Sequence, residues 1–272
     1  MKPAPGRCCA PPGRPIPPNP RKNTRREHRC RAGDLGSGCG RDHRADAGEP
    51  HRPAARTRGR GRDIADATGA VLCSVDYRLA PEHRYPVAND EAYAALHRLT
   101  DNATTWGVDP ARIGVGGDSA GGCLAAATAL RSRDENGPAI AQQVLFYPGI
   151  ERRTDRPSMC EFGDSPFFTA EDIDWMKNLY LGDDPATDDA YGVPALADSL
   201  AGLPPAILAV GYGDPLRDAV EAYGDRLRAA DVPTAQLPFP GVGHGFAMQA
   251  PSVARARAAI AEVGALVSAR FR

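Results

Sequence analysis

The sequence predicts an α/β fold in which a mostly parallel sheet carries helices on both faces. From about residue 62 to the end of the chain, apolar runs of strand length alternate with longer stretches of helical periodicity, which is typical of a parallel sheet. Ser119, Asp214 and His244 each follow one of these apolar runs. Because the carboxyl ends of parallel strands meet at one edge of a sheet, we expect these three side chains to gather there.

The element around Ser119 is predicted to be a strand, a sharp turn and a helix. The apolar run 112–115 reads as the strand, and the run 123–130 contains good helix formers. Between them lies the pattern Gly-x-Ser-x-Gly centred on Ser119, which is typical of a nucleophile elbow. We expect Gly117 and Gly121 to be required because side chains at these positions would collide inside the turn.

The remaining elements follow from the same periodicities. Further strands are predicted at 71–77, 140–148, 205–211 and 234–239, and further helices at 87–106, 216–230 and 253–271. Residues 150–200 contain no clear strand and are predicted to form a helical insertion, a partial cap over the site. Its expected apolar face consists of Phe167, Phe168, Trp175, Met176, Leu179, Tyr180 and Leu181. Such a face either buries against the body of the domain or contributes to the binding of an acyl chain.

The N-terminal segment, residues 1–61, differs from the rest of the chain. Residues 1–62 contain 16 Lys and Arg against 5 Asp and Glu, and they include no Phe, Trp, Tyr or Val. Such a segment buries too little apolar surface to offset its ordering entropy, so a disordered basic tail is predicted before a domain at 62–272. Its charge would suit nucleic acid or an acidic partner, but the tail lacks aromatic stacking residues and any recognisable binding fold, which argues against this role.

Metal binding, secretion and membrane insertion find no support in the sequence. The tail holds a group of metal-ligating residue types, namely Cys8, Cys9, Cys30, Cys39, His28, His43 and His51. Their spacing matches no zinc pattern, so no metal is expected. Cys73, Cys123 and Cys160 are expected to be buried free thiols and not to form disulfides. No signal peptide or membrane-spanning run is recognised, so a cytoplasmic location is predicted.

The chemistry expected at the sheet edge is nucleophilic catalysis. A serine hydroxyl needs a base within hydrogen-bonding distance and a carboxylate that orients that base. We assign Ser119 as the nucleophile, His244 as the base and Asp214 as the orienting carboxylate. Asp218 is the rival carboxylate, although its place inside a predicted helix favours a capping role.

Four blocks of sequence extend this interpretation. They are Tyr-Arg-Leu-Ala-Pro-Glu-His at 77–83, Gly-Asp-Ser-Ala-Gly-Gly at 117–122, Asp-Pro-Leu-Arg-Asp at 214–218 and Gly-His-Gly-Phe at 243–246. In identity, order and spacing the chain resembles the hormone-sensitive-lipase family of α/β hydrolases. The resemblance implies the α/β-hydrolase fold and a carboxylesterase that acts on small-molecule esters with short to medium acyl groups. It also implies that the Ala120 N–H is one oxyanion donor and that no cofactor is needed; a homodimer is left open.

One departure from the family pattern stands out. Family members carry a His-Gly-Gly-Gly loop that supplies further oxyanion donors, and residues 1–76 contain no such sequence. The N-terminal strands that surround this loop are also missing. We interpret residues 1–61 as an out-of-frame translation of that region, which predicts impaired activity. The alternatives are a non-catalytic relic that only binds, and a peptidase or amide hydrolase that uses the same three residues.

Overall fold

The computed structural model describes residues 63–165, 168–185 and 188–271. All of them belong to one compact unit, residues 52–272. The predictions of a disordered tail at 1–61 and of its cysteines and histidines lie outside the described residues, as does Phe167.

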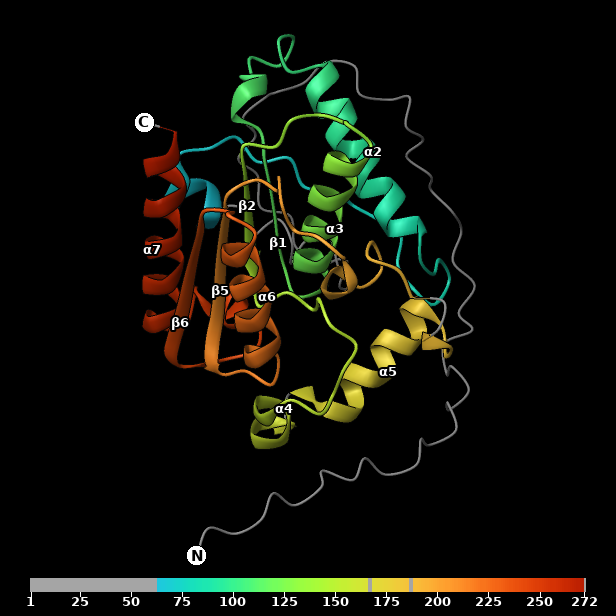
Figure 1. Cartoon of the computed structure of the whole chain (residues 1–272). Coiled ribbons are helices and arrows are strands. Elements are labelled where there is room, and N and C mark those ends of the chain that lie inside the picture. The colour runs from blue at the N-terminus through green and yellow to red at the C-terminus, as the bar shows by residue number, and fades with distance from the viewer. Residues whose placement is uncertain (1–62, 166–167, 186–187, 272) are drawn as a thin grey trace, which may run out of the picture. The chain divides into compact units, whose positions relative to one another are not determined.

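Four of the described strands form a parallel sheet, as predicted. Four strands lie in the order β1-β2-β5-β6, with bounds of Gly114–Asp118, Gln142–Phe146, Ala206–Gly213 and Thr234–Gly243. Gly117 pairs with Leu145, and Leu145 in turn pairs with Leu208. All strands therefore point the same way, and their carboxyl ends share one edge (Figure 1).

Four helices that lie before, between and after the strands along the chain pack around the sheet, which confirms the α/β fold. They are α2 (Val87–Asp101), α3 (Ala120–Asp134), α6 (Arg217–Ala229) and α7 (Ala254–Arg270). Helix α3 packs on β1 and β2, α6 packs on β5 and β6, and α7 lies against β6 (Figure 1). Helix α2 packs mainly on α3, and its Tyr93 and Leu96 belong to an apolar cluster against which Val115 of β1 packs.

The core lies around the central strands. Leu145 on β2 and Leu208 on β5 are fully enclosed, and Tyr223 and Leu227 on α6 cover them from the helical layer. The first six residues of β5 are all buried, as expected for a central parallel strand with both faces covered. This rigid centre fixes the strand ends from which Ser119, Asp214 and His244 extend.

The segment predicted as an insertion, 150–200, contains helices and a small hairpin. It contains α4 (Pro157–Phe162), the hairpin strands β3 (Asp164–Ser165) and β4 (Phe168–Thr169), α5 (Ala170–Leu181) and the short 3-10 helix η3 (Pro194–Leu196). Its predicted apolar face is wrong in part, because Trp175 and Met176 are exposed while Ile173 is buried. Ile173, Lys177 and Tyr180 share one helical face at spacings of four and three residues, and this face packs inward.

The strand predicted at 71–77 is absent from the described structure. These residues carry no regular secondary structure, and the side chains of Val71 and Leu72 are 85% and 46% exposed. A strand is held by hydrogen bonds to a neighbouring strand, and β1 is an edge of the described sheet. The apolar composition of 71–77 therefore does not suffice to make it a strand.

The cysteines follow the prediction only in part. Cys123 is buried and free, and Cys73 is free but exposed. Cys160 is disulfide-bonded, so the expectation of a free thiol is wrong there.

The part of the chain that the structure describes contains neither a membrane-spanning helix nor a metal-binding cluster. None of the helices in that part of the chain is long and apolar enough to cross a membrane. Within the same residues, no group of three His, Cys, Asp or Glu side chains could hold a metal ion.

Candidate active site

Ser119 occupies the sharp turn between β1 and α3. Its backbone has φ 52° and ψ −114°, a conformation that a residue with a side chain rarely adopts. Its N–H donates to the Phe146 carbonyl at 2.9 Å, and its carbonyl accepts from the Cys123 N–H at 3.0 Å. The turn is thus held by β2 on one side and by the first turn of α3 on the other.

The glycines of the turn have unequal roles. A Cβ added to Gly117 would lie 2.3 Å from the backbone carbon and oxygen of Gly121, and one added to Gly122 would lie 2.9 Å from Cβ of Pro148. A Cβ on Gly121 would meet no atom within 4 Å outside its own helix. The expectation that Gly121 must lack a side chain for steric reasons is therefore wrong, and the second close contact is at Gly122.

Asp214 directly follows β5 and is completely buried. One carboxylate oxygen accepts from the Leu216 N–H at 2.8 Å, and the two oxygens lie 3.1 and 3.0 Å from Nδ1 of His244. A buried carboxylate requires such partners, because an unpaired charge would carry a large desolvation penalty. Its two donors fix both its position and its orientation.

His244 directly follows β6, and its side chain is 10% exposed. Because Nδ1 faces a carboxylate, this nitrogen carries the proton and Nε2 is left as an acceptor. Ser119 Oγ lies 3.0 Å from Nε2, within range to donate to it. The structure therefore brings Ser119, His244 and Asp214 into one hydrogen-bonded chain.

Two aromatic rings enclose the imidazole of His244. The ring of Phe168, from β4 in the insertion, stacks on it with centroids 4.1 Å apart and planes inclined by 12°. The ring of Tyr147, which follows β2, lies at 4.9 Å and 60°. Sequence reasoning placed Phe168 only on the apolar face of the insertion and did not identify Tyr147 near the site. A signal for Phe168 was present in the capping motif of Thr169 and Asp172, which begins α5 immediately after it.

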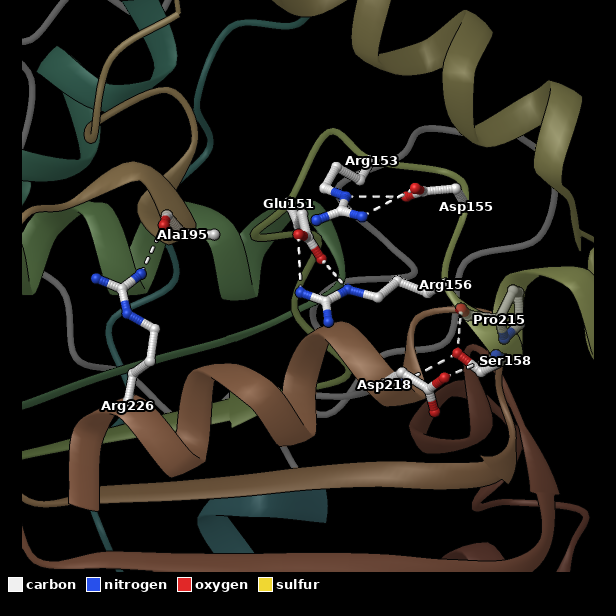
Figure 2. Close-up of polar contacts among 9 residues, drawn as sticks. All are labelled: Glu151, Arg153, Asp155, Arg156, Ser158, Ala195, Pro215, Asp218 and Arg226. Atoms are coloured by element: carbon white, nitrogen blue, oxygen red, sulfur yellow. Dashed lines mark hydrogen bonds and ion pairs between the residues drawn. The ribbon is translucent and has the colours of Figure 1, made fainter. Parts of the chain in front are cut away.

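The rival carboxylate, Asp218, is engaged elsewhere. Its Oδ2 accepts from the Ser158 N–H at 2.8 Å, and its Oδ1 contacts Arg217 at 3.1 Å. Figure 2 shows Ser158, near the start of α4, between Asp218 and Pro215. Asp218 thus caps a helix of the insertion, and only Asp214 faces His244.

Ala120, the expected oxyanion donor, is the first residue of α3 and is exposed. The N–H groups of a first helical turn have no partner within the helix, and the helix dipole favours negative charge at that end. A developing oxyanion beside Ser119 would meet this helix terminus.

This arrangement suits nucleophilic attack. The hydroxyl can pass its proton to the imidazole, the carboxylate stabilises the resulting imidazolium, and the helix terminus faces the attacked carbonyl.

Comparison with known proteins finds similarity to the α/β-hydrolase fold and to esterases. A family model described as alpha/beta hydrolase fold matches residues 53–248. Esterase LipI of Mycobacterium tuberculosis is 41% identical over 186 residues, which cover 68% of this chain and 58% of LipI. Carboxylic ester hydrolase LipN of the same organism is 44% identical over 189 residues, covering 66% of this chain and 50% of LipN. An ethyl acetate hydrolase of Pseudomonas putida is 32% identical, with 68% of this chain and 58% of the relative covered.

Solved structures similar to this chain include esterases as well. An esterase of Pyrobaculum calidifontis has a TM-score of 0.74 and 37% identity, covering 78% of this chain and 70% of the esterase. A thermostable esterase of Pseudomonas putida has a TM-score of 0.77 and 32% identity, covering 80% of this chain and 70% of the esterase. The chain spans only 50% to 58% of the length of the three curated relatives named above. The family match and these likenesses show that the chain belongs to the hormone-sensitive-lipase family of α/β hydrolases.

Proposed function

We propose that this chain is a serine carboxylesterase in which Ser119, His244 and Asp214 form the catalytic triad. The observation that carries the proposal is the hydrogen-bonded chain from Ser119 Oγ to His244 Nε2, 3.0 Å apart, and from His244 Nδ1 to Asp214 at 3.0 Å. The relatives named as esterases support the reaction class. Esters with short to medium acyl groups are the proposed substrates, which agrees with the relative named for ethyl acetate.

The proposed reaction proceeds through an acyl-enzyme. Ser119 Oγ attacks the ester carbonyl while His244 Nε2 takes its proton, and Asp214 stabilises the imidazolium. The tetrahedral oxyanion accepts from the Ala120 N–H at the start of α3. His244 then protonates the leaving alcohol. Water, deprotonated by His244, attacks the acyl carbonyl and releases the acid and free Ser119.

We also propose that the activity is impaired, because the His-Gly-Gly-Gly sequence is missing from residues 1–76. Loss of one oxyanion donor typically costs roughly 10² to 10³ in rate. The proposed reason is that residues 1–61 are read out of frame, before a hydrolase domain at 62–272. Translation of the encoding DNA in all three frames tests this proposal. A His-Gly-Gly-Gly loop that runs into residue 62 in another frame supports it, and the lack of such a loop in every frame overturns it.

Hydrolysis of p-nitrophenyl butyrate by the full chain, compared with Ser119→Ala, tests the proposed function. We expect slow hydrolysis that Ser119→Ala abolishes. Equal rates for the two proteins would refute the esterase proposal and leave the non-catalytic relic. The matching p-nitroanilide is the control for reaction class, because a faster rate on the anilide would favour an amide hydrolase.

A further inference from the structure

Two residues of the insertion support the proposed acid–base pair, one from the turn next to Asp214 and one on the ring of His244. Ser158 on α4 contacts the turn that carries Asp214, and Phe168 on β4 stacks on His244. We propose that Ser158 and Phe168 are positioning residues that hold the Asp214–His244 pair in its reactive geometry from the side of the insertion. This inference rests on the proposed function, since it assigns these residues a part in the same reaction.

Ser158 holds the turn after Asp214 through three hydrogen bonds. Its hydroxyl donates to the Pro215 carbonyl at 2.9 Å and accepts from the Asp218 N–H at 3.1 Å, while its own N–H donates to Asp218 Oδ2 at 2.8 Å (Figure 2). The residue is fully buried, with 0% exposure. Water therefore has no ready access to replace the lost partner if the hydroxyl is removed.

The Pro215 carbonyl belongs to the Pro215–Leu216 peptide. The N–H of this same peptide, that of Leu216, donates to an Asp214 carboxylate oxygen at 2.8 Å. The Ser158 hydroxyl therefore fixes a peptide that holds the Asp214 carboxylate. A shift of this peptide changes the direction in which Asp214 presents its oxygens to His244. Tight docking of Ser158 thus links the position of α4 to the orientation of the imidazole.

Phe168 holds the imidazole itself. The two rings are nearly parallel, at 12°, and 4.1 Å apart. Such a stack covers one face of the imidazole, and rotation of the imidazole out of plane would break it. The ring must keep Nδ1 on Asp214 and Nε2 on Ser119 through both proton transfers, so a flat aromatic neighbour favours the reactive orientation in each step.

The backbone beside Phe168 is well fixed. The Thr169 hydroxyl accepts from the Asp172 N–H at 3.0 Å, and Asp172 Oδ2 accepts from the Thr169 N–H at 3.0 Å. This reciprocal cap begins α5. The Ala170 N–H donates to the Gly163 carbonyl at 2.8 Å, which ties the start of α5 to the end of α4. Phe168 and Ile173 belong to the same apolar cluster, so the stacked ring is carried by an anchored helix start.

Kinetics of single variants provide the first test. Phe168→Leu keeps an apolar side chain but loses the flat face, so we expect kcat on p-nitrophenyl butyrate to fall roughly two- to tenfold with little change in KM. Phe168→Tyr keeps the flat aromatic face, so its kcat should stay close to that of the parent chain. Equal kcat values for the Leu and Tyr variants would overturn the role of Phe168.

Ser158→Ala is expected to lower kcat roughly tenfold through misplacement of Asp214. Its matched control is Ser132→Ala, because Ser132 is also a buried serine whose hydroxyl donates to a proline carbonyl, at 2.6 Å from Pro138. Ser132 lies near the far end of α3 from Ser119. The control should lose a similar amount of stability without losing kcat. An equal loss of kcat in both serine variants would overturn the role of Ser158.

A chemical measurement tests Phe168 without any turnover. Diethyl pyrocarbonate modifies accessible histidines, and mass spectrometry of peptides reports the rate for His244 against His97 of the same chain, which lies on α2. Phe168→Leu should raise the relative rate at His244 roughly threefold or more, since one ring face is uncovered, whereas Phe168→Tyr should not. An unchanged rate in Phe168→Leu overturns the inference. If Ser119→Ala hydrolyses the ester as fast as the parent chain, the proposed function is refuted. The rate of diethyl pyrocarbonate modification at His244 still decides whether Phe168 covers that ring.

Discussion

Addition of a single methyl group at Gly117 should disrupt the turn that carries Ser119. The Cβ of Gly117→Ala would lie 2.3 Å from the carbon and oxygen of Gly121 and 2.9 Å from the nitrogen of Gly122. These distances are well short of the roughly 3.5 Å at which carbon atoms pack. All three atoms are backbone atoms of the first turn of α3, so no side-chain rotation relieves the clash.

Relief of the clash requires a displacement of about 1 Å between β1 and α3. Overpacking of this kind costs about 1 to 3 kcal/mol of unfolding free energy. A misplacement of 1 Å at a reacting centre costs about 10² in rate, and Ser119 and Ala120 both lie within the displaced turn. We therefore expect Gly117→Ala to lose about 3 kcal/mol of stability and about 10² in kcat.

The matched control is Gly121→Ala, four residues away, where the added Cβ meets no atom within 4 Å outside its own helix. Urea denaturation gives the unfolding free energy of each variant, and hydrolysis of p-nitrophenyl butyrate gives kcat. Gly121→Ala should keep the parent stability to within about 0.5 kcal/mol. Comparable stability and kcat in the two variants would refute this account of the turn.

Three further predictions concern buried polar groups. Burial lowers the pKa of Lys177 to about 8, below the roughly 10.4 of an unfolded chain. Below pH 8 folding therefore carries the full cost of the buried charge, about 3 kcal/mol, and this cost is removed as the pH rises to about 10.4. Lys177→Met should raise the unfolding free energy at pH 7 by up to that amount. In this variant the unfolding free energy, measured by urea denaturation, should also increase less between pH 8 and 10 than in the parent chain. An equal increase in the two proteins would disprove the cost assigned to Lys177. Asp214→Asn should keep the fold but lower kcat by about 10⁴ because the imidazole loses its orienting acceptor; a loss below tenfold in an ester assay would contradict the role of Asp214. Burial raises the pKa of the Cys123 thiol to about 12, so iodoacetamide at pH 8 should alkylate the exposed Cys73 and leave Cys123 unmodified until urea is added, as peptide mass spectrometry can check.

Much of the sheet could be predicted from the sequence because the buried part of β5 is a continuous apolar run and β2 ends in the apolar residues Val144, Leu145 and Phe146. The prediction at 71–77 failed for a physical reason. Its composition resembles that of β5, but a strand also needs a hydrogen-bonding neighbour, and composition does not report whether one is present. Strand β6 extends to Gly243, beyond the predicted 234–239, so His244 directly follows the strand.

A site residue could be predicted where both its residue type and its local sequence pattern indicate its role, as for Ser119 in the Gly-x-Ser-x-Gly pattern. The supporting side chains were harder to find, because their roles arise from contacts between distant segments. Ser158 and Asp218 are separated by 60 positions, yet they bond reciprocally. Neither residue carries a local pattern that names its partner. Helix α5 shows the same limit, since Trp175 was expected on its apolar face because of its residue type and is exposed, whereas the ammonium group of Lys177 is buried.

Covalent labelling tests the central claim, that Ser119 is a nucleophile activated by His244, most directly. The full chain is treated with a fluorophosphonate, which reacts with activated serines, and its peptides are analysed by mass spectrometry beside those of His244→Ala. We expect one adduct per chain, on the peptide that contains Ser119, and little or no adduct in His244→Ala. Labelling of other serines at the same rate, or equal labelling of Ser119 in the two proteins, would contradict it.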